Sequence, residues 1–234
     1  MLGLGTGFYG VGGDMDLKGS WLPTDESSLE AWYKFGGPTK NPVDSWPDES
    51  GNGHHMLQAT SANQPANSSG VITFDGTNDY LQKASGTIAL TAEFTVGIKF
   101  DSTTTGRALL GGVNENNEMF KIMDSNTLRI KTSNETTSSA TSTVNMDLSD
   151  GSTFGDSHIV VTRDSSDDVR IWHNGVEQTP ASAQTLQYRV DIDAMGVRAT
   201  SLTNYWDGDI YEMQIFSSTS ADLTANVIAR LASL

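Results

Sequence analysis

The chain has 234 residues, a length that suits one large β domain or two small domains. Its 14 Lys and Arg residues are outnumbered by 29 Asp and Glu residues, which gives a formal net charge of -15. Such an excess of negative charge repels a phosphate backbone, so nucleic acid is excluded as a partner. The absence of Cys excludes disulfide scaffolds, thiolate zinc sites and thiol nucleophiles.

The acidic residues are mostly aspartate, with 20 Asp against nine Glu. Glu favours helices, whereas Asp bonds to its own backbone and favours turns. The surplus of Asp therefore predicts a loop-rich β protein. Short carboxylates in loops are also ligands that Ca²⁺ prefers.

The N-terminal stretch is rich in glycine, a composition too flexible to build its own core. Its first basic residue is Lys18, so it lacks the basic start of a secretion signal, and no stretch of the sequence predicts a membrane span. We interpret residues 1–24 as an extended arm and residues 25–234 as one domain. The side chains expected to make assembly contacts are Phe8, Tyr9, Trp21 and Leu22.

The rest of the chain alternates apolar and polar residues with period two. In Phe94–Phe100, every second side chain is apolar, which is typical of a half-buried strand. Turn-rich linkers such as Asp150-Gly151 separate the short runs, and many short strands of this kind predict a sandwich or barrel. The other expected strands are 29–35, 71–74, 108–113, 120–123, 128–132, 159–163, 169–173 and 210–216.

Two segments depart from this pattern. Residues 132–143 are almost entirely Thr, Ser, Asn and Ala, and we expect a solvent-facing loop there rather than the polar edge of a strand. Near the C-terminus, Leu223, Val227 and Leu231 share one face at helical spacing, three residues after Ser220. This spacing predicts a short amphipathic helix that packs on the sandwich.

Several motifs lie in the order typical of one known family. They include Asp48-Glu-Ser-Gly-Asn-Gly-His-His55, Ile72-Thr-Phe-Asp-Gly-Thr-Asn-Asp-Tyr-Leu81, His158–Arg163 with Val169–Gly175, and Trp206–Phe216. From about residue 28 to residue 234, the chain resembles the laminin-G-like, or concanavalin-A-like, jelly-roll family. The resemblance implies an all-β, two-sheet antiparallel jelly-roll sandwich, here with a short C-terminal helix and an extended N-terminal arm.

The resemblance also bears on metal binding. Two turns of the family sometimes flank structural Ca²⁺, and their oxygen donors here are Asp48, Asn52, Asp75 and Asn78. Against this, Asp in turns mostly caps backbone N–H groups, and Tyr211 stands where the family usually has Asp. We expect no required cofactor and at most a structural Ca²⁺ ion.

Carbohydrate binding is the activity that the resemblance most often implies, and it needs exposed aromatic rings among polar groups. Trp46, Tyr205 and Trp206 are the sugar-binding candidates because they fall in expected loops, and Trp172 is a further candidate. The alternative is that these rings pack in the core or close one end of the sandwich.

Some relatives of this fold are glycoside hydrolases, which need two carboxylates flanking the sugar bond. The best local pair is Asp191 and Asp193, expected on one face of a strand, but the family's hydrolase pattern has a third acid and uses Glu. We therefore expect no catalytic residues and a non-enzymatic protein, since function is argued from the site rather than from the fold.

The start of the chain, Met1–Phe8 with Trp21–Asp25, resembles the starts of small structural proteins of bacteriophages. We therefore expect a virion structural protein, a capsid decoration or tail-associated subunit assembled in the host cytoplasm, whose arm contacts other virion proteins. The alternative is a carbohydrate-binding module or adhesin outside the cell or on its surface, with a host glycan as partner. Assembly into a homo-oligomer is compatible with both hypotheses.

Overall fold

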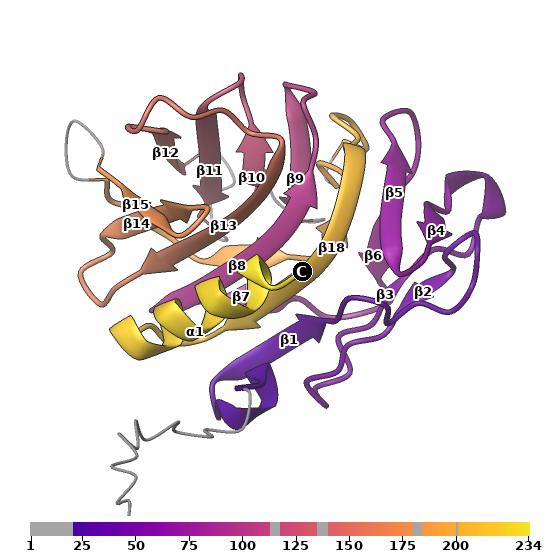
Figure 1. Ribbon diagram of the computed structural model, residues 1–234, viewed down its shortest axis with the longest axis horizontal. Coiled ribbons are helices and arrows are strands. Elements are labelled where there is room, and N and C mark those ends of the chain that lie inside the picture. The colour runs from indigo at the N-terminus through magenta and orange to yellow at the C-terminus, as the bar shows by residue number, and fades with distance from the viewer. Residues whose placement is uncertain (1–20, 113–117, 135–139, 180–183, 200) are drawn as a thin grey trace, which may run out of the picture.

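The computed structural model of the chain describes residues 21–112, 118–134, 140–179, 184–199 and 201–234. Two large antiparallel sheets lie face to face, and one α-helix crosses the outer side of one of them (Figure 1). This arrangement confirms the expected jelly-roll sandwich with a C-terminal helix.

One sheet, which we call the helix-side sheet, has eight strands. Seven strands lie in the order β15-β14-β13-β8-β18-β5-β4, and the eighth, β1, pairs with another part of β18. The strands are β1 (Leu29–Tyr33), β4 (Ala66–Ser68), β5 (Val71–Asp75), β8 (Phe94–Asp101), β13 (Asp156–Arg163), β14 (Val169–His173), β15 (Val176–Gln178) and β18 (Asp207–Phe216).

The other sheet, which we call the opposite sheet, also has eight strands, in the order β12-β11-β10-β9-β17-β6-β3-β2. The strands are β2 (Ser45–Trp46), β3 (Met56–Leu57), β6 (Leu81–Lys83), β9 (Arg107–Gly111), β10 (Glu118–Ile122), β11 (Thr127–Ser133), β12 (Thr141–Asp147) and β17 (Ala194–Met195). A separate pair joins β7 (Ile88–Leu90) to β16 (Val190–Ile192), and two 3-10 turns span Pro23–Asp25 and Ser61–Asn63.

The core lies between the two sheets, where the expected alternation places it. Phe94, Val96, Ile98 and Phe100 of β8 are all 0% exposed. They belong to one apolar cluster with inward-facing residues of the opposite sheet, such as Leu109. Burial of these side chains is the main driving force for closing the sandwich.

The helix α1 (Ala221–Ala232) packs on the outer face of β8 and β13, as its spacing predicts (Figure 1). Ser220 caps it, since the Ser220 hydroxyl accepts the Leu223 N–H at 3.0 Å. A Cβ on Gly97 of β8 would lie 2.4 Å from a Val227 methyl group. Glycine at this position therefore lets the helix approach the sheet closely.

A buried ion pair holds the other end of α1. The Glu212 side chain of β18 is 0% exposed and accepts hydrogen bonds from the Arg230 guanidinium, one of them 2.9 Å long. The same carboxylate accepts the Trp32 indole N–H at 3.0 Å and the Phe35 backbone N–H at 3.1 Å. Glu212 thus ties together the helix, β18 and β1.

The polar segment 132–143 differs from the expected loop. Its two ends extend β11 and β12, which pair from Thr127↔Asp147 to Ser133↔Thr141, while residues 135–139 lie outside the described part of the chain. Period-two burial at Val144 and Met146 continues the hairpin into a polar stretch. Cross-strand pairing therefore outweighs the low apolar content of this segment.

The turn after β5 does not close a hairpin. β5 pairs with β4 and β18 in the helix-side sheet, whereas β6 pairs with β3 and β17 in the opposite sheet. Asp75 holds the turn, since its Oδ1 accepts the backbone N–H groups of Thr77 at 2.8 Å and Asn78 at 3.1 Å. The turn thus carries the chain from one sheet to the other.

Candidate functional site

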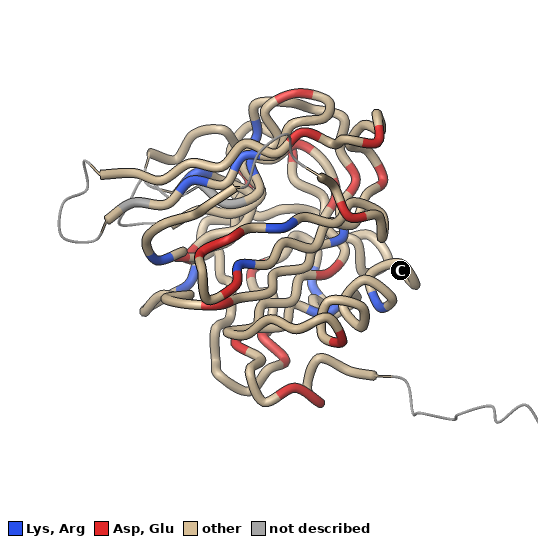
Figure 2. Tube along the Cα trace, turned by 90° about the vertical axis from the view of Figure 1, so that its left-hand side faces the viewer, with Lys and Arg blue, Asp and Glu red and all other residues tan. Residues whose placement is uncertain are grey.

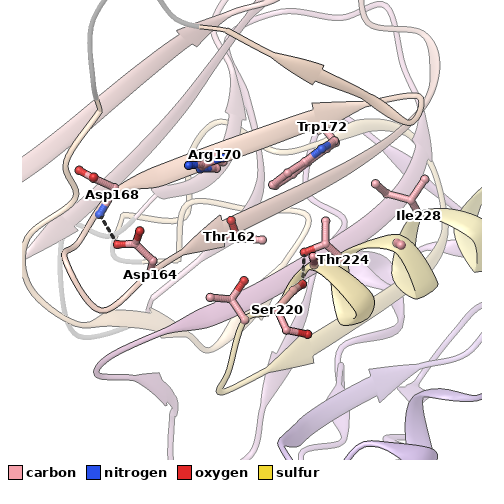
Figure 3. A pocket seen from close by; sticks show the side chains of 11 residues that line it. Thr162, Asp164, Asp168, Arg170, Trp172, Ser220, Thr224 and Ile228 are labelled. Carbon is pink, nitrogen blue, oxygen red and sulfur yellow. Dashed lines mark hydrogen bonds between the residues drawn. The ribbon is translucent and has the colours of Figure 1, made fainter.

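A groove of about 420 Å³ runs between the helix α1 and the outer face of β13 and β14 (Figure 3). One wall is the sheet with the turn that joins its two strands, and the other wall is the first half of the helix. The side chains that line the groove and carry the argument below are Thr162, Asp164, Asp168, Arg170, Trp172 and Thr224.

Strand alternation aims the sheet residues at the groove. In β14, Val169, Ile171 and His173 are buried in the sandwich, so Arg170 and Trp172 point outward (Figure 3). Trp172 is partly buried because one part of it packs against an apolar cluster under α1. This cluster consists of Leu29, Trp32, Val160, Phe216, Leu223, Val227 and Leu231. This packing fixes the ring while leaving part of it in the groove.

The turn between β13 and β14 places two carboxylates at one end of the groove. Oδ1 of Asp164 accepts the backbone N–H groups of Ser166 at 2.9 Å and Asp168 at 3.1 Å. Asp168 lies beside it and accepts the Thr185 hydroxyl at 3.4 Å. The Asp164 carboxylate therefore closes the turn, and both acidic side chains border the groove.

The Arg170 guanidinium projects along the same wall. It donates to the Glu177 carboxylate of the neighbouring strand at 3.3 Å, and both side chains are more than two-fifths exposed. On the helix wall, the Thr224 hydroxyl donates to the Ser220 carbonyl at 2.8 Å. The groove thus combines one indole ring with carboxylate, guanidinium and hydroxyl groups.

Such a combination suits a small polyhydroxylated ligand. An indole face packs against the C–H groups of a sugar ring, while carboxylates and hydroxyls bond to the ring's hydroxyl groups. Concave sites of this kind take most of their binding energy from apolar contact and their orientation from a few polar groups.

The sugar-binding role predicted for two of the three aromatic residues is wrong. Trp46 and Trp206 are both 0% exposed, so neither ring can stack on a ligand. The Trp46 indole donates to the Lys34 carbonyl at 3.1 Å, and Trp206 packs edge-on against Phe100 at 5.5 Å. Both rings fill the sandwich, where large apolar surfaces stabilise most.

Tyr205, the third candidate, is partly exposed but lies outside the groove. Its ring is 6.3 Å from that of Tyr80, and both pack on Ala194 of β17 and on Val197 and Ala199, which follow β17. Burial and the neighbouring Tyr80 raise the pKa of Tyr205 above its ordinary value. The structure does not bring Tyr205 together with Trp172.

The first pair of candidate metal ligands is engaged in turn bonding. The Asp48 carboxylate accepts backbone N–H groups of Trp32, Ser50 and His54, each at 2.9 Å. Burial raises the pKa of Asp48, but these donors outweigh burial and lower it below its ordinary value. Asn52 points its amide NH₂ at the Leu29 carbonyl at 2.9 Å.

The second pair behaves in the same way. Asp75 accepts the backbone N–H groups of its own turn, and the Asn78 amide donates to the Ala62 carbonyl at 2.7 Å. Within the described residues, no group of three or more His, Cys, Asp or Glu side chains could hold a metal ion. The four residues therefore do not form a convergent cage of oxygen ligands.

The arm residues fall into two groups. Phe8 and Tyr9 lie outside the described residues. Trp21 packs on its own domain, with its ring 6.2 Å from that of Phe216 and its indole N–H donating to Glu26 at 3.1 Å. Leu22 is 39% exposed. Trp21 therefore anchors the end of the segment to the domain, which differs from the expected contact with a partner.

The two aspartates considered for hydrolysis lie away from the groove and are 3% exposed each. Arg189 forms an ion pair with Asp191 at 2.7 Å, and Asp191 lies in β16, whereas Asp193 lies beyond the end of that strand. The two residues were expected on one strand, but between them the chain passes from the separate β7–β16 pair to β17 of the opposite sheet.

A serine–histidine contact appears that the sequence did not indicate. The His173 ring bonds to the Ser157 hydroxyl at 2.9 Å and to the Ser152 hydroxyl at 3.0 Å. Ser157 is 1% and His173 2% exposed, so a substrate has no access to this pair. Burial lowers the pKa of His173, which keeps the ring neutral between the two hydroxyls.

The groove itself was only partly visible in the sequence. Trp172 was a candidate, and the alternation of Val169–His173 places it on the outer face with Arg170. The facing wall comes from the helix, which lies about 50 residues later in the chain. Which outer-face side chains border a groove depends on where that helix docks, and no local pattern encodes that position.

Comparisons with known proteins agree with this fold. Residues 75–226 match a family model described as the concanavalin A-like lectin/glucanases superfamily. No curated protein matches the chain. In the described residues, no helix has the length and apolar character needed to cross a membrane.

Similar solved structures include the binding domain of Paraclostridial Mosquitocidal Protein 1, at 14% identity and a TM-score of 0.55, covering 91% of this chain and 53% of that one. The botulinum neurotoxin serotype D binding domain gives 13% identity, a TM-score of 0.55, and coverage of 87% and 51%. A binding domain of botulinum neurotoxin DC, solved in complex with rat synaptotagmin II, gives 14%, 0.54, and coverage of 89% and 52%.

This chain thus spans about half the length of those solved chains, and at such identities the likeness concerns the fold. The family model covers well over half of the sequence, and the two-sheet jelly roll is the fold that the motifs of residues 28–234 imply. The chain belongs to the concanavalin A-like lectin/glucanases superfamily.

Proposed function

We propose that this chain is a non-enzymatic, lectin-like binding domain that holds a carbohydrate in the groove between α1 and β14. The observation that carries the proposal is Trp172, an indole fixed by packing and bordered by Asp164, Asp168, Arg170 and Thr224. The similar solved chains are described as binding domains, which supports a binding role over a catalytic one.

The groove has a suitable size for this role. Its volume of about 420 Å³ falls within the range of about 300–1,000 Å³ typical of small-molecule sites. It opens along the outer face of the sheet, so a longer glycan can extend past the bound ring. A binding site that is open at the surface suits recognition of an attached chain end.

The test is a glycan-binding measurement on the full chain and two variants of one residue. Trp172→Phe keeps an aromatic face, whereas Trp172→Leu keeps apolar packing against the cluster under α1 but removes the ring. We expect Trp172→Phe to retain binding and Trp172→Leu to lose about two- to tenfold in affinity, since aromatic contacts contribute about 0.5–1.5 kcal/mol beyond burial. Equal binding by all three proteins would refute the proposal.

The virion structural role is a second candidate, favoured by the resemblance of Met1–Phe8 and Trp21–Asp25 to the starts of bacteriophage structural proteins. Residues 1–20 precede Trp21, which packs on Phe216 beside β1 and α1. We propose that this segment contacts other virion proteins. A deletion of residues 1–20 retains the Trp21 anchor, and it should abolish incorporation into particles while leaving the melting temperature of the domain unchanged. Normal incorporation of the shortened chain would contradict this role.

A further inference from the structure

We infer that the groove selects uncharged glycans, and that Asp164 and Asp168 exclude sugars carrying a carboxylate or sulfate. This inference rests on the proposed carbohydrate-binding function and adds the class of ligand. It starts from the charges that border the groove: two carboxylates, Asp164 and Asp168, and one guanidinium, Arg170.

The guanidinium is the group that would attract an acidic sugar, but a carboxylate already faces it. Arg170 donates to Glu177 at 3.3 Å across the β14–β15 pair. An anionic ligand would have to compete with Glu177 for Arg170 while it approached Asp164 and Asp168. The local balance around Trp172 is therefore negative.

Hydrogen bonds hold the Asp164 carboxylate more firmly than that of Asp168, which is exposed. Asp164 is fixed by the N–H groups of Ser166 and Asp168, and Asp168 accepts the Thr185 hydroxyl. Figure 3 shows Asp168 in line with Arg170 and Trp172, and Asp164 beside Asp168 in the turn that precedes β14. Carboxylates are acceptors only, so they bond well to sugar hydroxyls and repel sugar carboxylates and sulfates.

The surrounding protein reinforces this selection. The chain carries a formal net charge of -15, and Figure 2 shows Asp and Glu at bends on several sides of the trace. Two unit charges about 4 Å apart interact by about 1 kcal/mol in water and more near a protein surface, so two local carboxylates should disfavour an acidic sugar by about tenfold or more.

The experiment compares neutral glycans with their own sialylated or sulfated counterparts on one array, using the full chain. We expect the native protein to bind neutral members and to bind each acidic counterpart at least about tenfold more weakly. The double variant Asp164→Asn with Asp168→Asn should narrow that difference, because Asn keeps the Oδ1 acceptor that the Asp164 turn needs and removes both charges.

A matched control variant changes the net charge by the same amount, at two aspartates outside the groove. Asp44 is partly exposed and Asp156 is exposed, and they form ion pairs with Lys40 and Lys99, away from the groove. The double variant Asp44→Asn with Asp156→Asn should leave the preference unchanged. Raising ionic strength from about 0.01 M to about 1 M shortens the Debye length from about 30 Å to about 3 Å and should also narrow the preference.

The outcomes separate the inference from the function on which it rests. Binding to acidic counterparts that equals or exceeds binding to the neutral glycans would overturn the charge selection and leave the groove's proposed function intact. A preference that is unchanged in the groove double variant would also overturn it. Binding to no member of the array would overturn both the proposed function and this inference.

Discussion

The ion pair between Glu212 and Arg230 offers a test of how the groove's helix wall is held. Glu212 is 0% exposed, whereas the Arg230 side chain is 17% exposed and its guanidinium also lies 4.8 Å from the centre of the Trp32 ring. Arg230→Met keeps the length and apolar stem of the side chain but leaves the Glu212 carboxylate buried without its counterion.

The expected cost follows from this burial. Removing one partner of a buried ion pair typically costs about 3–5 kcal/mol, because the remaining charge cannot be solvated. The remaining bonds from Trp32 and Phe35 to Glu212 place the expected cost at the lower end, about 3 kcal/mol. For a chain of this size, such a loss lowers the melting temperature by about 6–12 °C.

A double-mutant cycle isolates the interaction. Glu212→Gln retains an acceptor for the Trp32 indole while removing the charge, and in that background Arg230→Met should cost about 1 kcal/mol or less. Urea unfolding of the four proteins measures the coupling, with equal m-values as the check on two-state behaviour. A cost below about 1 kcal/mol for Arg230→Met in the native background would refute the conclusion that this pair holds the helix.

Three further outcomes follow from the structure. Gly97→Ala should lower the free energy of unfolding by about 1–3 kcal/mol, because its Cβ would meet Val227; an unchanged urea midpoint would show that the helix approaches less closely. Burial and the neighbouring Asp75 raise the pKa of Asp79 to about 6, above an unfolded value of about 3.9. Because the folded state binds the proton more tightly, stability falls as pH rises from about 4 to about 6. Asp79→Asn should flatten the pH dependence of the free energy of unfolding, measured in urea, over this range. An equal pH dependence in both proteins would contradict the assignment. Neither EDTA nor added Ca²⁺ should shift the melting temperature, since N–H donors already occupy the Asp48 carboxylate, and a Ca²⁺-dependent rise would contradict this.

The strongly patterned elements could be predicted from the sequence. Phe94–Phe100 shows period-two alternation and becomes β8, and the spacing of Leu223, Val227 and Leu231 becomes the buried face of α1. In each case the local pattern and the tertiary burial agree, so one apolar face identifies both the element and its orientation.

The shorter elements were missed for a physical reason. Strands such as β2 and β3 have two residues each, which is too short for any periodicity to show. β2 pairs with β3, and β3 pairs in turn with β6, which lies more than 20 residues further along the chain. Strands that exist because of a distant partner leave little trace in their own residues.

In the candidate site, too, local sequence predicts one part and the packing of distant elements decides the rest. Trp46 lies between Ser45 and Pro47 and is fully buried, whereas Trp172 lies between Ile171 and His173 and borders the groove. Strand alternation placed Trp172 on an outer face, but that face becomes a groove only where α1 docks beside it. Exposure of an aromatic ring depends on the packing of distant elements, which residue type alone does not encode.

The most direct test of the groove as a carbohydrate site is to map a bound glycan on the isotope-labelled full chain by NMR. We expect a neutral glycan to shift the Trp172 indole N–H, the backbone signals of residues 162–172 and those of residues 219–228, which together surround the groove. Shifts confined to the Tyr80–Tyr205 surface, with the Trp172 signal unmoved, would contradict the account.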